Sequence, residues 1–290
     1  MFAIIGFVVV IGAVIGGFLM EHGKLLVLMQ PSELVIIGGA GIGTLLIANP
    51  VPVLIRLLKG AIGILQPSRH AKPFYIETLK MLNELFQQAR KGGIAKLESD
   101  VEEPEKSPIF SKYPKFLKDH HAVDFVCDTL RMAVTGGVTH FDLDQMMESD
   151  MEVHHHEVLV PINALTTMAD SLPGLGIVAA VLGVVITMGA LGGPPEEIGH
   201  KVAAALVGTF LGILMCYGFF GPLASNMSKA SESESHYYHC LRVAIIAFVR
   251  GAPPILAVEF ARRVIPAEHR PSFKEMEAGV KGGGTVAAAA

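Results

Sequence analysis

The chain has 290 residues, of which 51% are hydrophobic and only 17% are charged. Soluble domains carry about 25% charged residues, so this composition is unusually apolar. The net charge of −4 gives no reason to expect a nucleic-acid partner. The three cysteines have no metal, redox or disulfide spacing, so no metal site is expected.

Four segments of the chain contain no Asp, Glu, Lys, Arg or His. About 20 helical residues at 1.5 Å per residue cross a hydrocarbon core about 30 Å thick, and each segment reaches that length. The first segment has no Lys or Arg before Lys24, which favours a retained helix over a cleaved signal peptide. The sequence predicts an all-α, polytopic membrane protein whose four spans form two pairs. The segments are Phe2–Met20, Leu34–Ile55, Leu172–Gly192 and Val202–Met227.

The distribution of Lys and Arg predicts the orientation. The two short connections hold only Lys24 and Lys201, while the other basic residues lie in the long connection and the tail. Basic loops favour the cytoplasm, so both termini are expected there. The predicted divisions are 1–58 (spans one and two), 59–171 (a cytoplasmic helical insert), 172–227 (spans three and four) and 228–290 (a cytoplasmic tail with a disordered end).

The insert shows helical periodicity, and no breaker separates its last helix from the third span. Asp142 followed by Gln145 resembles a capping box at the start of that helix. Residues 99–114 contain three prolines and are expected to form a loop. An amphipathic stretch is expected at 237–250.

The mixed charges of residues 84–119 suit a solvated face or an electrostatic docking surface. The histidines at 154–156 are expected on a solvated surface, because consecutive residues point in different directions.

The spans lack the ionisable side chains that usually mark ion pathways. Either the chain moves no ion, or a partner supplies the acid. No catalytic arrangement or phosphate loop appears, so an enzyme is not expected and no cofactor is implied.

Small residues and prolines are the remaining features of the spans. Gly39 and Gly43, like Gly208 and Gly212, are four residues apart, a spacing that lets membrane helices approach one another closely, within this chain or against another. Pro173 and Pro222 each remove a helical hydrogen bond, so they either kink a helix or mark its first or last turn. Thr209 places a hydroxyl group among small residues in the fourth span.

Several segments together resemble one known family. The third span opens with ADSLPGLGIVAAVLGVV, the fourth contains AALVGTFLGILMCYGFFGPLA, and the insert holds CDTLRMAVTGG and MESDMEVHHHE. With the two pairs of spans, these segments resemble the MotA stator subunits of the flagellar motor, within the MotA/TolQ/ExbB proton channel family.

The resemblance implies a pentameric ring around a MotB dimer, which supplies a membrane aspartate and a peptidoglycan anchor. Proton flow would then drive the ring, and the insert would turn the rotor through FliG. The alternative is an energiser of outer-membrane processes of the ExbB or TolQ type, which has three spans.

The same resemblance assigns roles to individual residues. Arg90 and Glu98 match the rotor-facing charges. Gly176 and Gly183 become places of close helix approach. Ala180 stands where sodium-driven relatives carry a threonine, so protons are expected as the coupling ion. The expected ion-path residues are Pro173, Ala180, Thr209, Tyr217 and Pro222.

Overall fold

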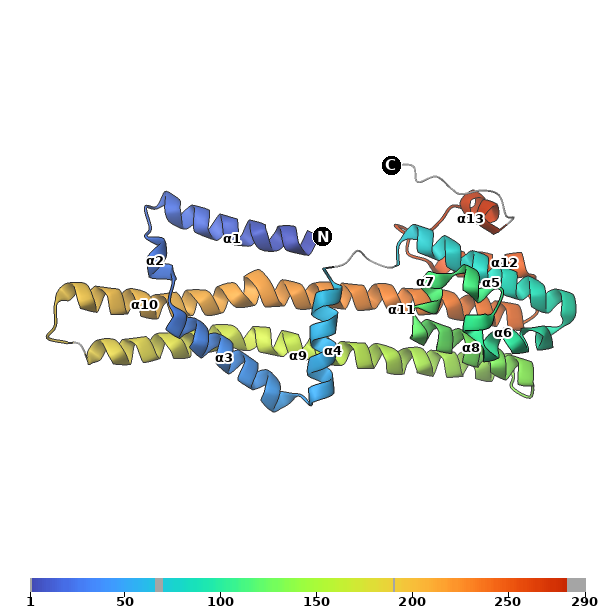
Figure 1. Cartoon of the computed structure of the whole chain (residues 1–290), viewed down its shortest axis with the longest axis horizontal. Helices are drawn as coiled ribbons and strands as arrows, with labels where there is room; N and C mark the ends of the chain where they lie inside the picture. The colour runs from blue at the N-terminus through green and yellow to red at the C-terminus, as the bar shows by residue number, and fades with distance from the viewer. Residues whose placement is uncertain (1, 66–69, 190, 281–290) are drawn as a thin grey trace. The chain divides into compact units, whose positions relative to one another are not determined.

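The computed structural model describes residues 2–65, 70–189 and 191–280, and within these ranges the regular structure is helical, with no strand (Figure 1). The chain divides into two compact units, which we describe separately. Unit 1 comprises residues 1–67 and 157–230, and unit 2 comprises residues 68–156 and 231–290.

Unit 1 contains the apolar helices, and two long helices contribute residues to both units. The elements of unit 1 are α1 (Phe2–Met20), α2 (Leu25–Leu28), α3 (Pro31–Ala48), α4 (Val51–Gly63), α10 (Pro195–Leu214) and the π-helix η4 (Met215–Phe220). The shared helices are α9 (His140–Met188) and α11 (Gly221–Val249).

Unit 2 is built from shorter helices and 3₁₀ turns around the ends of these long helices. Its own elements are α5 (Lys72–Gly92), η1 (Ile94–Leu97), α6 (Glu98–Glu102), η2 (Pro104–Lys106), η3 (Phe110–Lys112), α7 (Pro114–Leu117), α8 (His120–Thr135), α12 (Pro254–Val264) and α13 (Phe273–Val280).

Four helical stretches are long and apolar enough to cross a membrane, which confirms the predicted number of spans. They lie at Ala3–Met20, within Leu25–Ala48, within His140–Met188 and within Pro195–Val249. The third stretch belongs to α9, which continues through Pro173 as predicted.

The predicted limits of the second span, 34 and 55, are wrong at both ends. Helix α3 begins at Pro31, where proline suits the first turn, and ends at Ala48. Asn49 precedes Pro50 and takes an extended conformation, with φ −132° and ψ 139°. The ring of a following proline disfavours the helical region, so the chain turns here and α4 begins anew at Val51.

The tail also differs from the sequence-based expectation. No glycine or proline interrupts the chain between Pro222 and Val249, and α11 runs through all of it, so residues 237–250 are not a separate amphipathic helix. Gly251, at φ +95°, ends the helix. From Ser231 on, the tail groups with the insert in unit 2, whereas the predicted divisions separated the two. The disordered end expected from the sequence is 279–290; Gly279 and Val280 are instead the last residues of α13, and the remainder lies outside the described residues.

Three local expectations in unit 2 are corrected by hydrogen bonds. The cap of α9 is Thr139, whose hydroxyl accepts a hydrogen bond from Asp142 N at 3.1 Å, so the capping pair is not Asp142 and Gln145. Residues 99–114 form short helical turns rather than an open loop. Asp100 is 1% exposed and accepts hydrogen bonds from Gln88 Nε2 at 2.6 Å and Ser107 Oγ at 2.5 Å, so it belongs to no solvated face.

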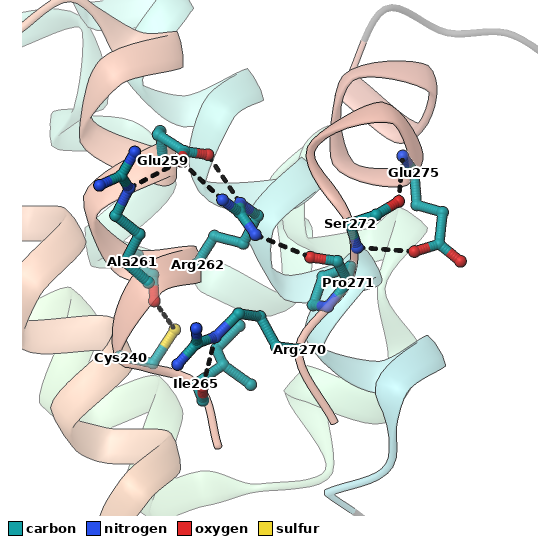
Figure 2. Close-up of polar contacts among 10 residues, drawn as sticks. Cys240, Glu259, Ala261, Arg262, Ile265, Arg270, Pro271, Ser272 and Glu275 are labelled. Atoms are coloured by element: carbon teal, nitrogen blue, oxygen red, sulfur yellow. Dashed lines mark hydrogen bonds and ion pairs between the residues drawn. The ribbon is translucent and has the colours of Figure 1, made fainter. Parts of the chain in front are cut away.

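Polar contacts within the tail connect α12, α13 and the segment between them (Figure 2). Arg262 donates two hydrogen bonds of 2.7 Å to the Glu259 carboxylate and one of 3.0 Å to Pro271 O. Ser272 caps α13, and its amide donates to Glu275 at 2.6 Å. Hydrogen bonds from Lys72 and Ser272 lower the pKa of Glu275 to about 2. These contacts hold the connection between α12 and α13 in place.

The expectation of solvated histidines is wrong for His154. Its ring stacks on His121, with 3.8 Å between ring centroids, and its Nε2 lies 3.4 Å from Glu234 Oε1. Both rings pack edge-on against Tyr238. Burial, and then the neighbouring His154, lower the pKa of His121. His121 is therefore held neutral in the folded chain.

The first prediction concerns this histidine pair. Because the folded pKa of His121 is below its unfolded value of about 6.5, the unfolded chain binds the proton first as pH falls. The His121 contribution to stability is thus complete above about pH 6.5 and is lost below it, by at most about 1.4 kcal/mol per pH unit. His121→Phe keeps a flat ring and should flatten this acid-side loss of unfolding temperature, measured by circular dichroism.

His156→Phe is the matched control, since the His156 side chain is 72% exposed. The control should keep the wild-type pH profile. Equal profiles for wild type and His121→Phe would contradict the assignment.

Candidate functional site

The backbones of α9 and α10 touch at glycines in unit 1. A Cβ atom built on Gly176 would lie 2.9 Å from Gly208 O, and one built on Gly212 would lie 2.5 Å from Leu172 O. Real Cβ atoms do not come that close to backbone atoms, so only glycine fits at these two positions. Gly183 repeats the pattern further along, where a Cβ would lie 2.7 Å from Ala205 Cβ.

Gly39 and Gly43 of α3, where close helix packing was expected, contact no other helix of this chain among the described residues. A Cβ at either position would meet no described atom within 4 Å. Gly41, between them, is the buried one: its Cβ would lie 3.1 Å from Leu172 Cδ2 and 3.6 Å from Met168 Sδ. Helix α3 therefore packs on α9 through Gly41 and presents Gly39 away from the chain's own helices.

Two expected ion-path residues lie at the α9–α10 contact. A Cβ on Gly208 would be 3.3 Å from Ala180 N, and one on Gly176 would be 3.3 Å from Thr209 Cα. The structure thus brings Ala180 and Thr209 to the same glycine-lined contact, although 29 positions separate them in the sequence. Thr44 and Thr187, by contrast, donate to the carbonyls of Gly41 and Gly183, each at 2.8 Å.

The two prolines lie at irregular or interior positions. Pro173 lies inside α9, directly after Leu172, whose carbonyl faces Gly212. Pro222 occupies the second position of α11, immediately after the π-helix η4. Neither marks a free helix end: α9 continues through Pro173, and the helical path continues from η4 into α11. Pro222 provides no N–H, and a wider turn next to it shifts the hydrogen-bond pattern of the backbone. Tyr217, within η4, is 71% exposed.

Sequence reasoning missed one ionisable residue in the site. Glu33 lies in the first turn of α3 and is 5% exposed, whereas the predicted span began after it. A Cβ on Gly208 would come within 2.6 Å of Glu33 Oε2, so the carboxyl fills the space above that glycine. The signal was available: Pro31 followed two residues later by an acid is typical of a helix start, not of a loop.

Arg90 and Glu98 belong to unit 2 and form a separate set. Both are exposed, Arg90 near the end of α5 and Glu98 at the start of α6. Gly93, at φ +83°, turns the chain between them, and the buried Asp100 hydrogen bonds hold α6 against α5. An adjacent groove of about 580 Å³ is lined by Glu84, Lys91, Lys96 and Lys112, among others.

Known proteins are similar to this sequence along nearly its whole length. The family description "Motility protein A N-terminal" matches residues 4–93, and "MotA/TolQ/ExbB proton channel family" matches residues 118–239. Motility protein A of Escherichia coli K12 is 41% identical over 97% of this chain and 95% of its own. The chain belongs to the Motility protein A family. Chemotaxis protein LafT of Vibrio parahaemolyticus is 36% identical over 94% of this chain and 96% of its own.

Solved structures share the fold. The MotAB structure from C. jejuni matches with a TM-score of 0.77 at 19% identity, covering 93% of this chain and 98% of that one. The MotAB stator complex from Bacillus subtilis matches with a TM-score of 0.75 at 22% identity, covering 92% and 97%. The arrangement of helices described above is therefore the one that occurs in this family.

The second prediction concerns the glycine contact. Gly212→Ala would force a methyl group onto Leu172 O and should separate α9 from α10. The purified, detergent-solubilised variant should unfold at a lower temperature than wild type. Gly39→Ala is the matched control: nothing described lies near it, and alanine stabilises helix interiors by about 0.5–1 kcal/mol relative to glycine. A Gly212→Ala protein as stable as the control would contradict the close contact.

Proposed function

We propose that this chain is a stator subunit of a bacterial flagellar motor and assembles with a MotB partner into a proton-conducting complex. The observation that carries the proposal is the 41% identity with a motility protein over 97% of the chain. The similarity of the fold to MotAB complexes supports the partner.

The α9–α10 contact supports a division of labour between the two proteins. Residues 172–188 of α9 and 202–214 of α10 contain no Asp, Glu, Lys, Arg or His. Under this proposal MotB supplies the membrane aspartate, and this chain supplies the apolar, close-packed wall beside it. The work is conversion of ion flow into motion, not catalysis of a reaction.

Protons are the proposed coupling ion. A sodium ion needs several oxygen ligands in place of its water, whereas a proton needs one acceptor and a water path. At the α9–α10 contact Ala180 contributes no side-chain oxygen, and Thr209 contributes one. Even with the Glu33 carboxyl beside Gly208, the side chains named at this contact offer a sodium ion few oxygen ligands.

The energy that one proton releases on crossing the membrane is of the size needed to rearrange helical turns at Pro173 and η4. One charge crossing 100 mV releases about 2.3 kcal/mol. This shifts a two-state equilibrium roughly fiftyfold, enough to rearrange turns at Pro173 and η4 but not to unfold a packed helix.

The proposed assembly is a pentameric ring in the inner membrane, with both termini and unit 2 in the cytoplasm. Arg90 and Glu98 are the proposed contacts with FliG. Both side chains are exposed, and they lie on either side of the turn at Gly93 in unit 2. An ExbB or TolQ type of energiser fits less well, because the N-terminal match and the fourth span belong to the motility branch.

The third prediction tests the coupling ion. In cells that lack their own stators, this chain and its partner should restore rotation in medium without sodium, measured as the speed of tethered cells. The chain without its partner should restore no rotation and cause no proton leak. Rotation that appears only after sodium is added would contradict proton coupling.

The fourth prediction tests the rotor contacts. Arg90→Glu combined with Glu98→Lys should reduce torque several-fold, because both charges of an electrostatic contact are inverted. The amount of variant protein in the membrane should be unchanged, as judged by immunoblotting. Lys106→Glu combined with Glu103→Lys inverts an exposed pair nearby and should leave torque unchanged. Loss of the Arg90 and Glu98 variant from the membrane would instead mean that these charges hold unit 2 together.

A further inference from the structure

The proposed ion path leaves one buried acid of this chain without a role. Glu33 is 5% exposed, and no described atom makes a hydrogen bond with its Oε2. An intramembrane ionisable residue is expensive to retain and usually functional. A carboxylate in an apolar interior is stabilised by a cation, by donors or by taking up a proton, and no described side chain supplies a cation or a donor to Oε2.

The position of Oε2 relates Glu33 to the ion path. The carboxyl lies over Gly208, in the space that a Cβ there would fill at 2.6 Å from Oε2. The same Cβ would lie 3.2 Å from Ala179 Cβ and 3.3 Å from Ala180 N. Thr209 is the next residue of α10. Glu33 therefore reaches the contact of α9 and α10 beside Gly208 and Ala180, next to Thr209 in the chain.

A groove in unit 1 approaches Glu33 from the side of the short connections. It has a volume of about 730 Å³, and its walls carry Lys24, Glu196, Glu197, His200 and Lys201. The groove is open rather than enclosed, and these charged side chains lie in an otherwise mainly apolar lining. Gln30 and Ala204 also line it. Glu33 comes three positions after Gln30, and Gly208 comes four positions after Ala204. Each is therefore about one helical turn beyond the groove.

We propose that Glu33 is a proton relay between this groove and the site at Ala180 and Thr209. The proposal rests on the proposed function, in which the groove faces the outer side. The carboxylate accepts a proton at Oε2 from water in the groove, which leaves hydroxide there to exchange with bulk water. The neutral carboxyl then gives that proton to a water beside Thr209, from which the partner's aspartate takes it, and Glu33 returns to its anionic form.

The relay has a mechanical signature that a structural role does not share. At low load, motor speed is limited by how fast protons arrive. Near stall, torque is set by the energy of each proton and not by its rate of arrival. Loss of a relay should therefore reduce low-load speed and leave stall torque unchanged, whereas poor folding should reduce both.

The fifth prediction uses Glu33→Gln, which keeps the shape of the side chain and removes its proton exchange. We expect a several-fold lower speed at low load, with a larger solvent deuterium isotope effect, and wild-type torque near stall. Glu33→Asp, which still exchanges a proton, should recover part of the speed. Glu21→Gln changes an exposed carboxyl outside the groove and is the matched control, with wild-type speed expected.

Infrared spectroscopy of the purified chain in liposomes tests proton binding independently of motility. Wild type should show the band of a protonated carboxyl that titrates with pH, and Glu33→Gln should lack it. Identical spectra, unchanged low-load speed, or an equal loss of torque at all loads would overturn the relay. Failure of the wild-type chain to restore rotation would refute the proposed function, while the infrared band would still decide whether Glu33 binds the proton.

Discussion

The contact between the backbones of α9 and α10 is the constraint on which the rest of unit 1 depends. Membrane helices gain nothing from leaving lipid for one another, so they associate through close van der Waals packing and satisfied polar groups. Gly176 and Gly212 allow that closeness because neither has a side chain. The contact in turn fixes which residues of the two helices face each other: Ala180 lies against Gly208, and Thr209 lies against Gly176.

The interior proline of α9 and the π-helix that follows α10 lie at one end of this contact. Pro173 follows Leu172, whose carbonyl faces Gly212, and η4 begins three residues after Gly212. A rigid glycine contact with irregular backbone beside it can bend at one end without separating. This arrangement suits a small movement driven by an energy of the size that one proton supplies.

The buried Asp100 and Glu33 and the half-buried His121 illustrate three ways in which this chain accommodates ionisable groups. Asp100 receives hydrogen bonds from Gln88 and Ser107, which makes it a structural carboxylate that shapes the turn near Arg90 and Glu98. His121 is held neutral by burial and by the stacked His154. Glu33 has an oxygen without a partner at the glycine contact. Of the three, Glu33 is therefore the group on which the proposed proton relay depends.

The sequence by itself determined the number of spans, their pairing and the family. Long charge-free runs have few alternatives outside a membrane, and the segments around Pro173 and Thr209 are specific to the family. Only the tertiary structure decided that Gly41 rather than Gly39 or Gly43 packs on α9, that the tail belongs with the insert, and that Glu33 lies inside the site. Hydropathy reports the environment of a segment as a whole. Which face of a helix meets a neighbour, and which charge lies buried there, depends on helix rotation and register, and these are set by contacts between residues distant in the chain.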